Sequence, residues 1–158
     1  MLRKIFLSYH FDEESKKLAS KIENLIRSFN IMVVTGEHVA GAKLATHIKS
    51  EIEKCDALIF ILSKRAEGRT NDWVLDEVAT AKANNKLFFG LLEEGITIPS
   101  PLVGREYYTY SSSESSNLWL KLCNTLNIWI KQKGRPIFAI IQPDTLVEEL
   151  REFSDLDT

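Results

Sequence analysis

Two uninterrupted apolar runs, Ala57–Leu62 (ALIFIL) and Leu87–Leu92 (LFFGLL), constrain the fold more than any other feature of the sequence. Strands that are apolar at every position are covered on both faces, which is typical of the centre of a parallel sheet. Parallel neighbours need a crossover between them, usually a helix. The sequence supplies one, because Asp72–Ala83 between the two runs carries apolar residues at helical spacing.

The same alternation of strand and helix extends along the chain. Short apolar and aromatic runs predict three further strands at Lys4–Tyr9, Ile31–Val34 and Glu106–Tyr110, the last at a sheet edge. Helical spacing predicts three more helices, the first of them capped by Asp12. Their apolar stripes are Leu18, Ile22, Leu25, Ile26 and Phe29, then Leu44, Ile48 and Ile52, then Leu118, Leu122, Leu126 and Trp129. We therefore predict an α/β fold of the flavodoxin-like class, a doubly wound, five-stranded parallel sheet with helices on both faces.

Size and charge narrow the functional classes. A chain of 158 residues suits one domain. Its 20 basic and 22 acidic residues give a net charge of −2, which argues against nucleic-acid or membrane binding through bulk charge. No apolar run approaches the length of a membrane span, and no signal peptide is recognisable, so we expect a cytoplasmic protein. Cys55 and Cys123 form neither a disulfide framework nor a zinc motif, and we expect buried structural thiols.

The C-terminal part of the chain departs from this pattern. Gly134 and Pro136 end the last helix, after which Ile137–Ile141 (IFAII) predicts another strand and Asp144 caps a short helix. We predict a domain over residues 1–133 and an extension over residues 134–158. The extension is either an extra edge element or the start of a truncated second domain, and the sequence leaves both alternatives open.

Several familiar sites are missing from the sequence. There is no P-loop, no dinucleotide-binding glycine fingerprint and no nucleophile elbow. The histidines His10, His38 and His47 fall on separate predicted elements without metal-like spacing, so we predict no metal. Ser63 follows the third strand, where a receiver domain would carry its phosphoacceptor aspartate.

The pair Trp73 and Glu77 is the strongest chemical signal. Four residues apart on a helix, the two side chains share one face. An indole offers a flat stacking surface, and a carboxylate can stabilise an oxocarbenium-like transition state when an N-glycosidic bond is cleaved. Burial against the indole would raise the pKa of the carboxyl. A cationic nicotinamide leaving group needs no general acid, so one carboxylate would suffice. The alternative is a packed tryptophan beside a solvated glutamate.

Four ordered motifs give this pair a context. The segments are KIFLSYHFDEE, GEHVAGAKL, ALIFILSKRA and NDWVLDEVATAK. Together they resemble the Toll/interleukin-receptor (TIR) domain over roughly Leu2 to Lys131. That family shows a first strand ending in F-x-S-[YH], a glycine-containing BB loop after the second strand, a third strand ending in L-S, and a W-x-x-x-E helix.

The resemblance implies specific roles. Enzymatic TIR domains of bacteria, plants and animal axons keep a catalytic glutamate on this helix, which Glu77 matches. Their substrate is NAD⁺, consumed without a further cofactor. The resemblance implies substrate contacts at Ser8, His10, Phe11, Trp73 and, in the BB loop, Glu37 and Lys43. For Phe11 the alternative is a hydrophobic staple on the following helix.

The predicted function follows from this resemblance. We predict an NAD⁺ glycohydrolase of bacterial anti-phage type, which releases nicotinamide and yields ADP-ribose or a cyclic ADP-ribose isomer. The resemblance implies activation by self-association through the BB loop, Gly36–Lys43, and a sensor domain that is either fused or separate. Two alternatives stay open: a non-enzymatic TIR–TIR interaction or scaffold module, and a nucleoside deoxyribosyltransferase-like enzyme.

Overall fold

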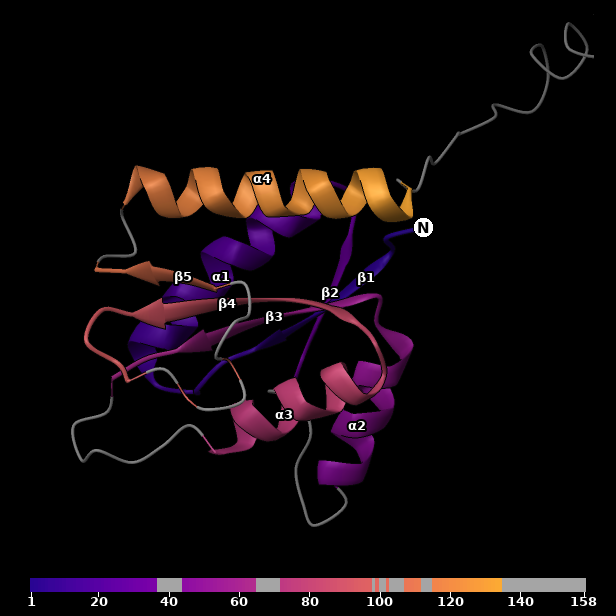
Figure 1. Cartoon of the computed structure of the whole chain (residues 1–158), viewed down its shortest axis with the longest axis horizontal. Helices are drawn as coiled ribbons and strands as arrows, with labels where there is room; N and C mark the ends of the chain where they lie inside the picture. Colours follow the sequence, from indigo (N-terminus) through magenta and orange to yellow (C-terminus); the bar gives the residue numbers. More distant parts are fainter. Residues whose placement is uncertain are drawn as a thin grey trace, which may run out of the picture.

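A five-stranded, all-parallel sheet forms the centre of the molecule (Figure 1). The computed structural model describes residues 1–36, 44–64, 72–97, 99, 102, 107–111 and 115–134. The strand order is β2-β1-β3-β4-β5, so the sheet winds outward in both directions from β1 and β3. The strands are β1 (Lys4–Ser8), β2 (Met32–Thr35), β3 (Ala57–Leu62), β4 (Leu87–Glu93) and β5 (Tyr107–Tyr110).

Helices cover both faces of the sheet (Figure 1). The helices α1 (Glu13–Ser28) and α4 (Ser116–Lys133) lie on one face, and α2 (Leu44–Lys54) and α3 (Asp72–Ala83) lie on the other. Successive side chains of a strand point to opposite faces of the sheet. In β3, Ile59 packs towards α1 and α4, whereas Phe60 packs towards α2 and α3. All six residues of β3 are buried, as expected for a strand covered on both faces.

The predicted fold class is confirmed, and the differences concern strand ends. β1 stops at Ser8 instead of Tyr9, and β2 is shifted by one residue to Met32–Thr35. Pairing decides both ends. Ser8 is the last residue of β1 that pairs with β3, opposite Phe60, and Met32 to Thr35 are the residues of β2 that pair with β1. β4 gains Glu93, which pairs with Tyr110 of the neighbouring strand. The predicted start of the last strand at Glu106 lies outside the described residues.

The predicted C-terminal strand and short helix also lie outside the described residues. Of the predicted extension over residues 134–158, the structure describes Gly134 alone. Cys55 is buried just past the end of α2, as expected, whereas Cys123 on α4 is only half-buried. Burial raises the pKa of the Cys55 thiol to about 11, which keeps it protonated.

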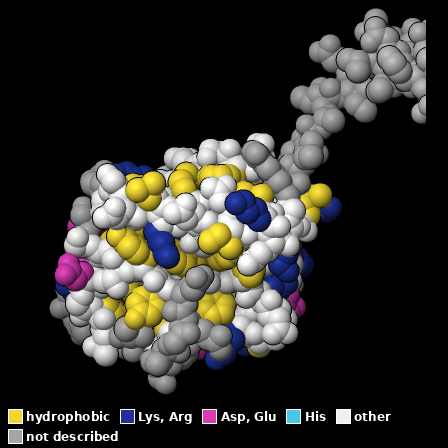
Figure 2. Space-filling view, turned by 45° about the horizontal axis from the view of Figure 1, so that its top comes forward, with side chains coloured by type: hydrophobic (Ala, Val, Ile, Leu, Met, Phe, Trp, Pro, Cys, Tyr) yellow, Lys and Arg dark blue, Asp and Glu magenta, His cyan; other side chains and the backbone are white. Residues whose placement is uncertain are grey.

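The surface on the α4 side carries apolar side chains in several separate groups, with scattered basic side chains among them (Figure 2). On α4 itself Leu120 and Ile128 are exposed. Within the described part of the chain, none of the helices combines the length and apolarity needed to cross a membrane.

Candidate functional site

The predicted site residues gather beyond the carboxyl ends of β1 and β2. The chain leaves β1 through Tyr9, His10 and Phe11 before α1 begins, and it leaves β2 at Gly36. Helix α3 brings Trp73 in its first turn and Glu77 one turn later. In doubly wound sheets ligands bind at this edge, near the point where the strand order reverses. Here that point lies between β1 and β3.

Glu77 is the one buried carboxylic acid among the described residues, with 8% of its surface exposed. Burial, which disfavours the charged form, raises its pKa to about 7 from an ordinary value of 4.5. The nearby Ser8 hydroxyl partly opposes this rise, and the charge of Asp76 adds to it. Ser8 Oγ is itself buried and has no hydrogen-bond partner within bonding distance among the described residues. Its influence on Glu77 is therefore that of a nearby dipole.

Gly36, the residue after β2, lies close to the Glu77 carboxyl group. A Cβ atom added at Gly36 would lie 3.8 Å from Glu77 Oε1 and 3.8 Å from Phe11 Cζ. The same atom would lie 3.4 Å from Ile48 Cδ1. Any side chain longer than alanine would thus occupy the space beside Glu77. The glycine keeps open a gap between the carboxyl group and the Phe11 ring.

Three aromatic rings cluster at the first turn of α3, one turn before Glu77. The His10 imidazole stacks on the Trp73 indole, with ring centroids 4.8 Å apart and planes inclined by 19°. Phe11 stacks on the same indole at 6.1 Å and 26°. Phe11 and Trp73 are nevertheless exposed over 41% and 40% of their surfaces. They present a partly open aromatic surface that a flat ring can contact.

Phe11 contacts a lysine, Lys16, in place of the hydrophobic staple predicted as its alternative role. The residue at the staple position of α1 is Lys16, whose Nζ lies 6.0 Å from the centre of the Phe11 ring. An apolar partner on the helix would have drawn Phe11 into the core. Lysine leaves the ring at the surface beside Trp73.

Asp12 fixes the position of His10. One carboxylate oxygen, Oδ1, caps α1 by accepting from the Ser15 N–H at 2.8 Å, and the other, Oδ2, lies 2.9 Å from His10 Nδ1. Burial alone would raise the pKa of Asp12, but the hydrogen bonds from Ser15 and His10 lower it below its ordinary value. The aspartate is therefore charged at neutral pH. His10 is oriented by the Asp12 carboxylate, by the Asp12 backbone N–H, which donates to Nδ1 at 3.2 Å, and by stacking on Trp73.

Five of the seven predicted site residues lie together at this edge, namely Ser8, His10, Phe11, Trp73 and Glu77. The other two, Glu37 and Lys43, lie outside the described residues. The sequence did not predict two features of the site: the closeness of Gly36 to Glu77, and the contact of Asp12 with His10. Asp12 was predicted only as a helix cap. Both residues lie inside the motifs KIFLSYHFDEE and GEHVAGAKL, but neither motif predicts these contacts. Among the described residues no group of three or more His, Cys, Asp and Glu side chains is placed to hold a metal ion.

Comparison with known proteins places the chain in a family. The sequence profile described as "TIR domain" matches residues 5–123, three quarters of the chain. No curated protein sequence matches the chain as a relative.

Solved structures share the fold at low sequence identity. A 2-deoxyribosyltransferase from Bacillus psychrosaccharolyticus has a TM-score of 0.55 at 16% identity, with 70% of this chain and 87% of that chain covered. A flavodoxin from the domain Archaea has a TM-score of 0.50 at 16% identity, covering 83% and 99%. The heterodimer of the RPS4 and RRS1 TIR domains includes a chain with a TM-score of 0.53 at 16% identity, covering 80% and 96%. The four ordered motifs, the strand order and the profile match agree, and this chain belongs to the TIR domain family.

Proposed function

We propose that this TIR domain is an NAD⁺ glycohydrolase that cleaves the bond between nicotinamide and ribose, with Glu77 as the catalytic residue. The observation that carries the proposal is a buried carboxyl group beside an open aromatic surface. Nicotinamide is a flat, cationic ring, so Trp73 and Phe11 offer it stacking and Glu77 offers it a counter-charge.

The protonation of Glu77 fits this substrate. Without substrate, burial holds the pKa of Glu77 at about 7, so near neutral pH much of the group is uncharged. A nicotinamide cation placed beside it favours the carboxylate and lowers the pKa again. The charge then forms where positive charge develops on the ribose during bond cleavage, and it stabilises that transition state.

Water is the one further reactant that hydrolysis needs. The nicotinamide–ribose bond breaks, and its electron pair leaves with nicotinamide, which becomes neutral. The ribosyl cation is stabilised by Glu77 or captured by it transiently. Attack by water gives ADP-ribose and releases a proton, while attack by an adenine nitrogen of the same molecule gives a cyclic product.

One alternative enzyme shares this fold. The neighbour from Bacillus psychrosaccharolyticus is a deoxyribosyltransferase, a protein that acts on nucleosides. The likeness at 16% identity concerns the fold alone, and the family profile favours the TIR domain. Incubation with deoxynucleosides separates the two, because base exchange on deoxynucleosides without NAD⁺ cleavage would overturn our proposal.

Nicotinamide release from NAD⁺ tests the proposal. We compare the wild type with Glu77→Gln, which keeps the size of the side chain and removes its charge, and with Glu53→Gln as a matched control. Glu53 is exposed on α2, away from the site. We expect release by the wild type and the control, and a loss of about 100-fold or more in Glu77→Gln. Equal release by Glu77→Gln would contradict the catalytic role of Glu77, and no release by any variant at high concentration would favour the non-enzymatic scaffold.

We further propose that self-association through the BB loop, Gly36–Lys43, activates the domain in anti-phage defence. Gly36 lies beside Glu77, so a neighbouring copy that engaged this loop would act close to the catalytic group. The rate per protein molecule should therefore rise with protein concentration. A rate per molecule that stays constant while the protein passes from monomer to oligomer would refute activation by association.

A further inference from the structure

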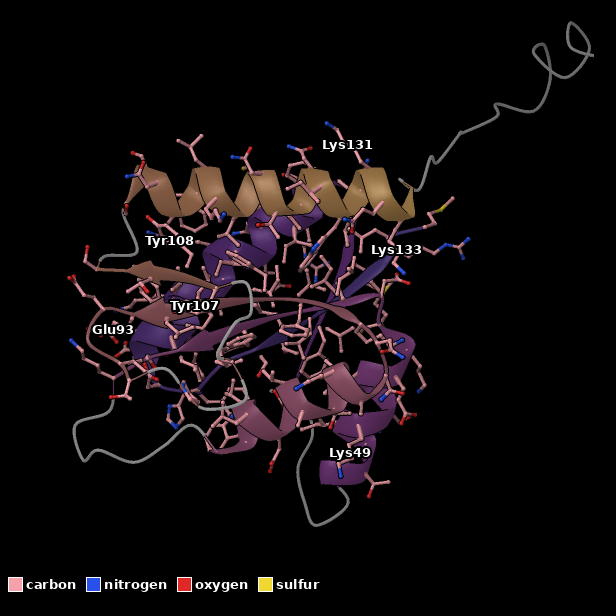
Figure 3. All side chains as sticks on the ribbon, in the orientation of Figure 1. Lys49, Glu93, Tyr107, Tyr108, Lys131 and Lys133 are labelled. Carbon is pink, nitrogen blue, oxygen red and sulfur yellow. The ribbon has the colours of Figure 1, made fainter. Side chains whose placement is uncertain are left out.

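A cavity lies at the same edge of the sheet, on the side of α1. Its volume is about 310 Å³, within the range of small-molecule sites. The first turns of α1 contribute Glu14, Ser15 and Lys17, and the ends of three strands contribute Ser63, Glu93 and Tyr110. Glu93 stands at the carboxyl end of β4 (Figure 3), next to the last residue of β5.

The polar groups of this cavity are fixed in place. Ser15 Oγ and Ser63 Oγ lie 2.9 Å apart, which ties α1 to the end of β3. The Glu93 carboxylate accepts the Lys64 backbone N–H at 2.7 Å through Oε2. Burial and the negative charges of Glu93, Asp12 and Glu14 raise the pKa of the Tyr110 hydroxyl. The phenol therefore keeps its proton and acts as a hydrogen-bond donor.

This combination of groups selects a neutral polyol. The carboxylates of Glu14 and Glu93 accept hydrogen bonds, whereas the hydroxyls of Ser15, Ser63 and Tyr110 can donate as well as accept. An anion is disfavoured by two carboxylates facing one lysine. A small cation would leave the hydroxyl donors unused. A sugar diol uses both kinds of group, and carboxylates bind ribose diols in nucleotide-binding folds.

Asp12 joins this cavity to the Glu77 site. Its carboxylate contacts His10 of the first site and caps α1 through Ser15, which lines the second. Its charge also acts on Tyr110. The Glu77 site and this cavity therefore share Asp12 at the start of α1.

We propose that the cavity between the start of α1 and the ends of β4 and β5 binds the cis-diol of the adenosine ribose of NAD⁺. The assignment of this ligand rests on the proposed function. If cleavage occurs beside Glu77, the nicotinamide ribose lies there, and the sugar that reaches this cavity is the adenosine ribose. Glu93 and Tyr110 are then residues that bind substrate at a distance from the bond that breaks.

Calorimetric titration of the full chain with ADP and with 2′,3′-dideoxy-ADP tests the diol directly, because the two probes differ only in the ribose hydroxyls. Two hydrogen bonds, at least one to a carboxylate, should make ADP bind about ten-fold or more tightly than the dideoxy probe. Tyr110→Phe and Glu93→Gln should each reduce this preference. Tyr108→Phe is the matched control, since Tyr108 lies on the same strand two residues earlier and packs against the core (Figure 3). It should keep the full preference.

The outcomes separate this inference from the proposed function. Equal affinity for the two probes, absent ADP binding, or a preference unchanged by both Tyr110→Phe and Glu93→Gln would overturn the diol site, even if NAD⁺ is cleaved. A preference lost in those two variants and kept in Tyr108→Phe would support the diol site, even if NAD⁺ is not cleaved. Where NAD⁺ is cleaved, Tyr110→Phe should raise KM several-fold while kcat stays within about two-fold.

Discussion

Replacing Glu77 by glutamine should stabilise the folded protein at alkaline pH and leave it little changed at acidic pH. In the folded chain burial raises the pKa of Glu77 to about 7, whereas the unfolded chain titrates near the ordinary value of 4.5. Below pH 4.5 both states hold the proton, and the group is neutral in each. Between these two values the unfolded chain loses the proton while the folded chain keeps it. The free energy of unfolding therefore falls as the pH rises.

The size of the effect follows from the two pKa values. They differ by about 2.5, and each pKa unit corresponds to about 1.4 kcal/mol, so the full effect is about 3 kcal/mol. This is a large fraction of the stability of a typical domain. Glutamine carries no charge to bury, so its stability should lack this dependence on pH.

Urea denaturation at about pH 4.5, 6 and 8 measures the difference between the wild type and Glu77→Gln. We expect the advantage of Glu77→Gln to grow by about 3 kcal/mol from the lowest to the highest pH. Glu53→Gln, an exposed substitution on α2, should show no such trend. An advantage of Glu77→Gln that is the same at all three pH values would refute the reasoning that burial keeps this carboxyl group protonated.

Three further predictions address the surroundings of the site. Ser8→Ala removes the hydroxyl that opposes the effect of burial, so the pKa of Glu77 should rise further, as a carbon-13 NMR titration of the carboxyl would show; an unchanged or lower pKa would contradict this. Gly90→Ala should destabilise by about 2–3 kcal/mol in thermal or urea unfolding, because the new Cβ would lie 2.7 Å from Phe60 Cε2, and Phe60→Leu should recover part of the loss. Asp12→Ala removes the cap on α1 and should cost about 1 kcal/mol of stability. Asp12→Ser should restore the cap but not the contact with His10. An equal loss of stability in both variants would contradict the contribution of the cap.

The sheet could be predicted from the sequence because its central strands and their helices are strongly patterned. Ala57–Leu62 is apolar throughout and forms β3 with the predicted bounds, and Asp72–Ala83 forms α3 as predicted. Strand ends were less certain, because pairing with a neighbour decides them. Glu93 belongs to β4 through its pairing with Tyr110, a partner 17 residues later in the chain.

The candidate site was predictable in part for a similar reason. Trp73 and Glu77 are neighbours on one helix, so their spacing alone brings them together. The approach of Gly36 to Glu77 depends on how β2 and α3 pack, which no local pattern encodes. The contact of Asp12 with His10 depends on the rotamer of His10 and on the stacking of its ring on Trp73. The cavity on the side of α1 combines the start of one helix with the ends of three strands, and its members carry no common motif.

The pH dependence of NAD⁺ cleavage tests most directly the claim that the buried Glu77 carboxylate carries the reaction. The kcat/KM for nicotinamide release reports on the free enzyme, in which the pKa of Glu77 is about 7. Because the charged form stabilises the ribosyl cation, we predict that kcat/KM rises through pH 7 and levels off above it, and that Glu77→Gln lacks both the activity and the rise. A profile that is flat across this range, or that falls as the carboxyl group ionises, would contradict the account.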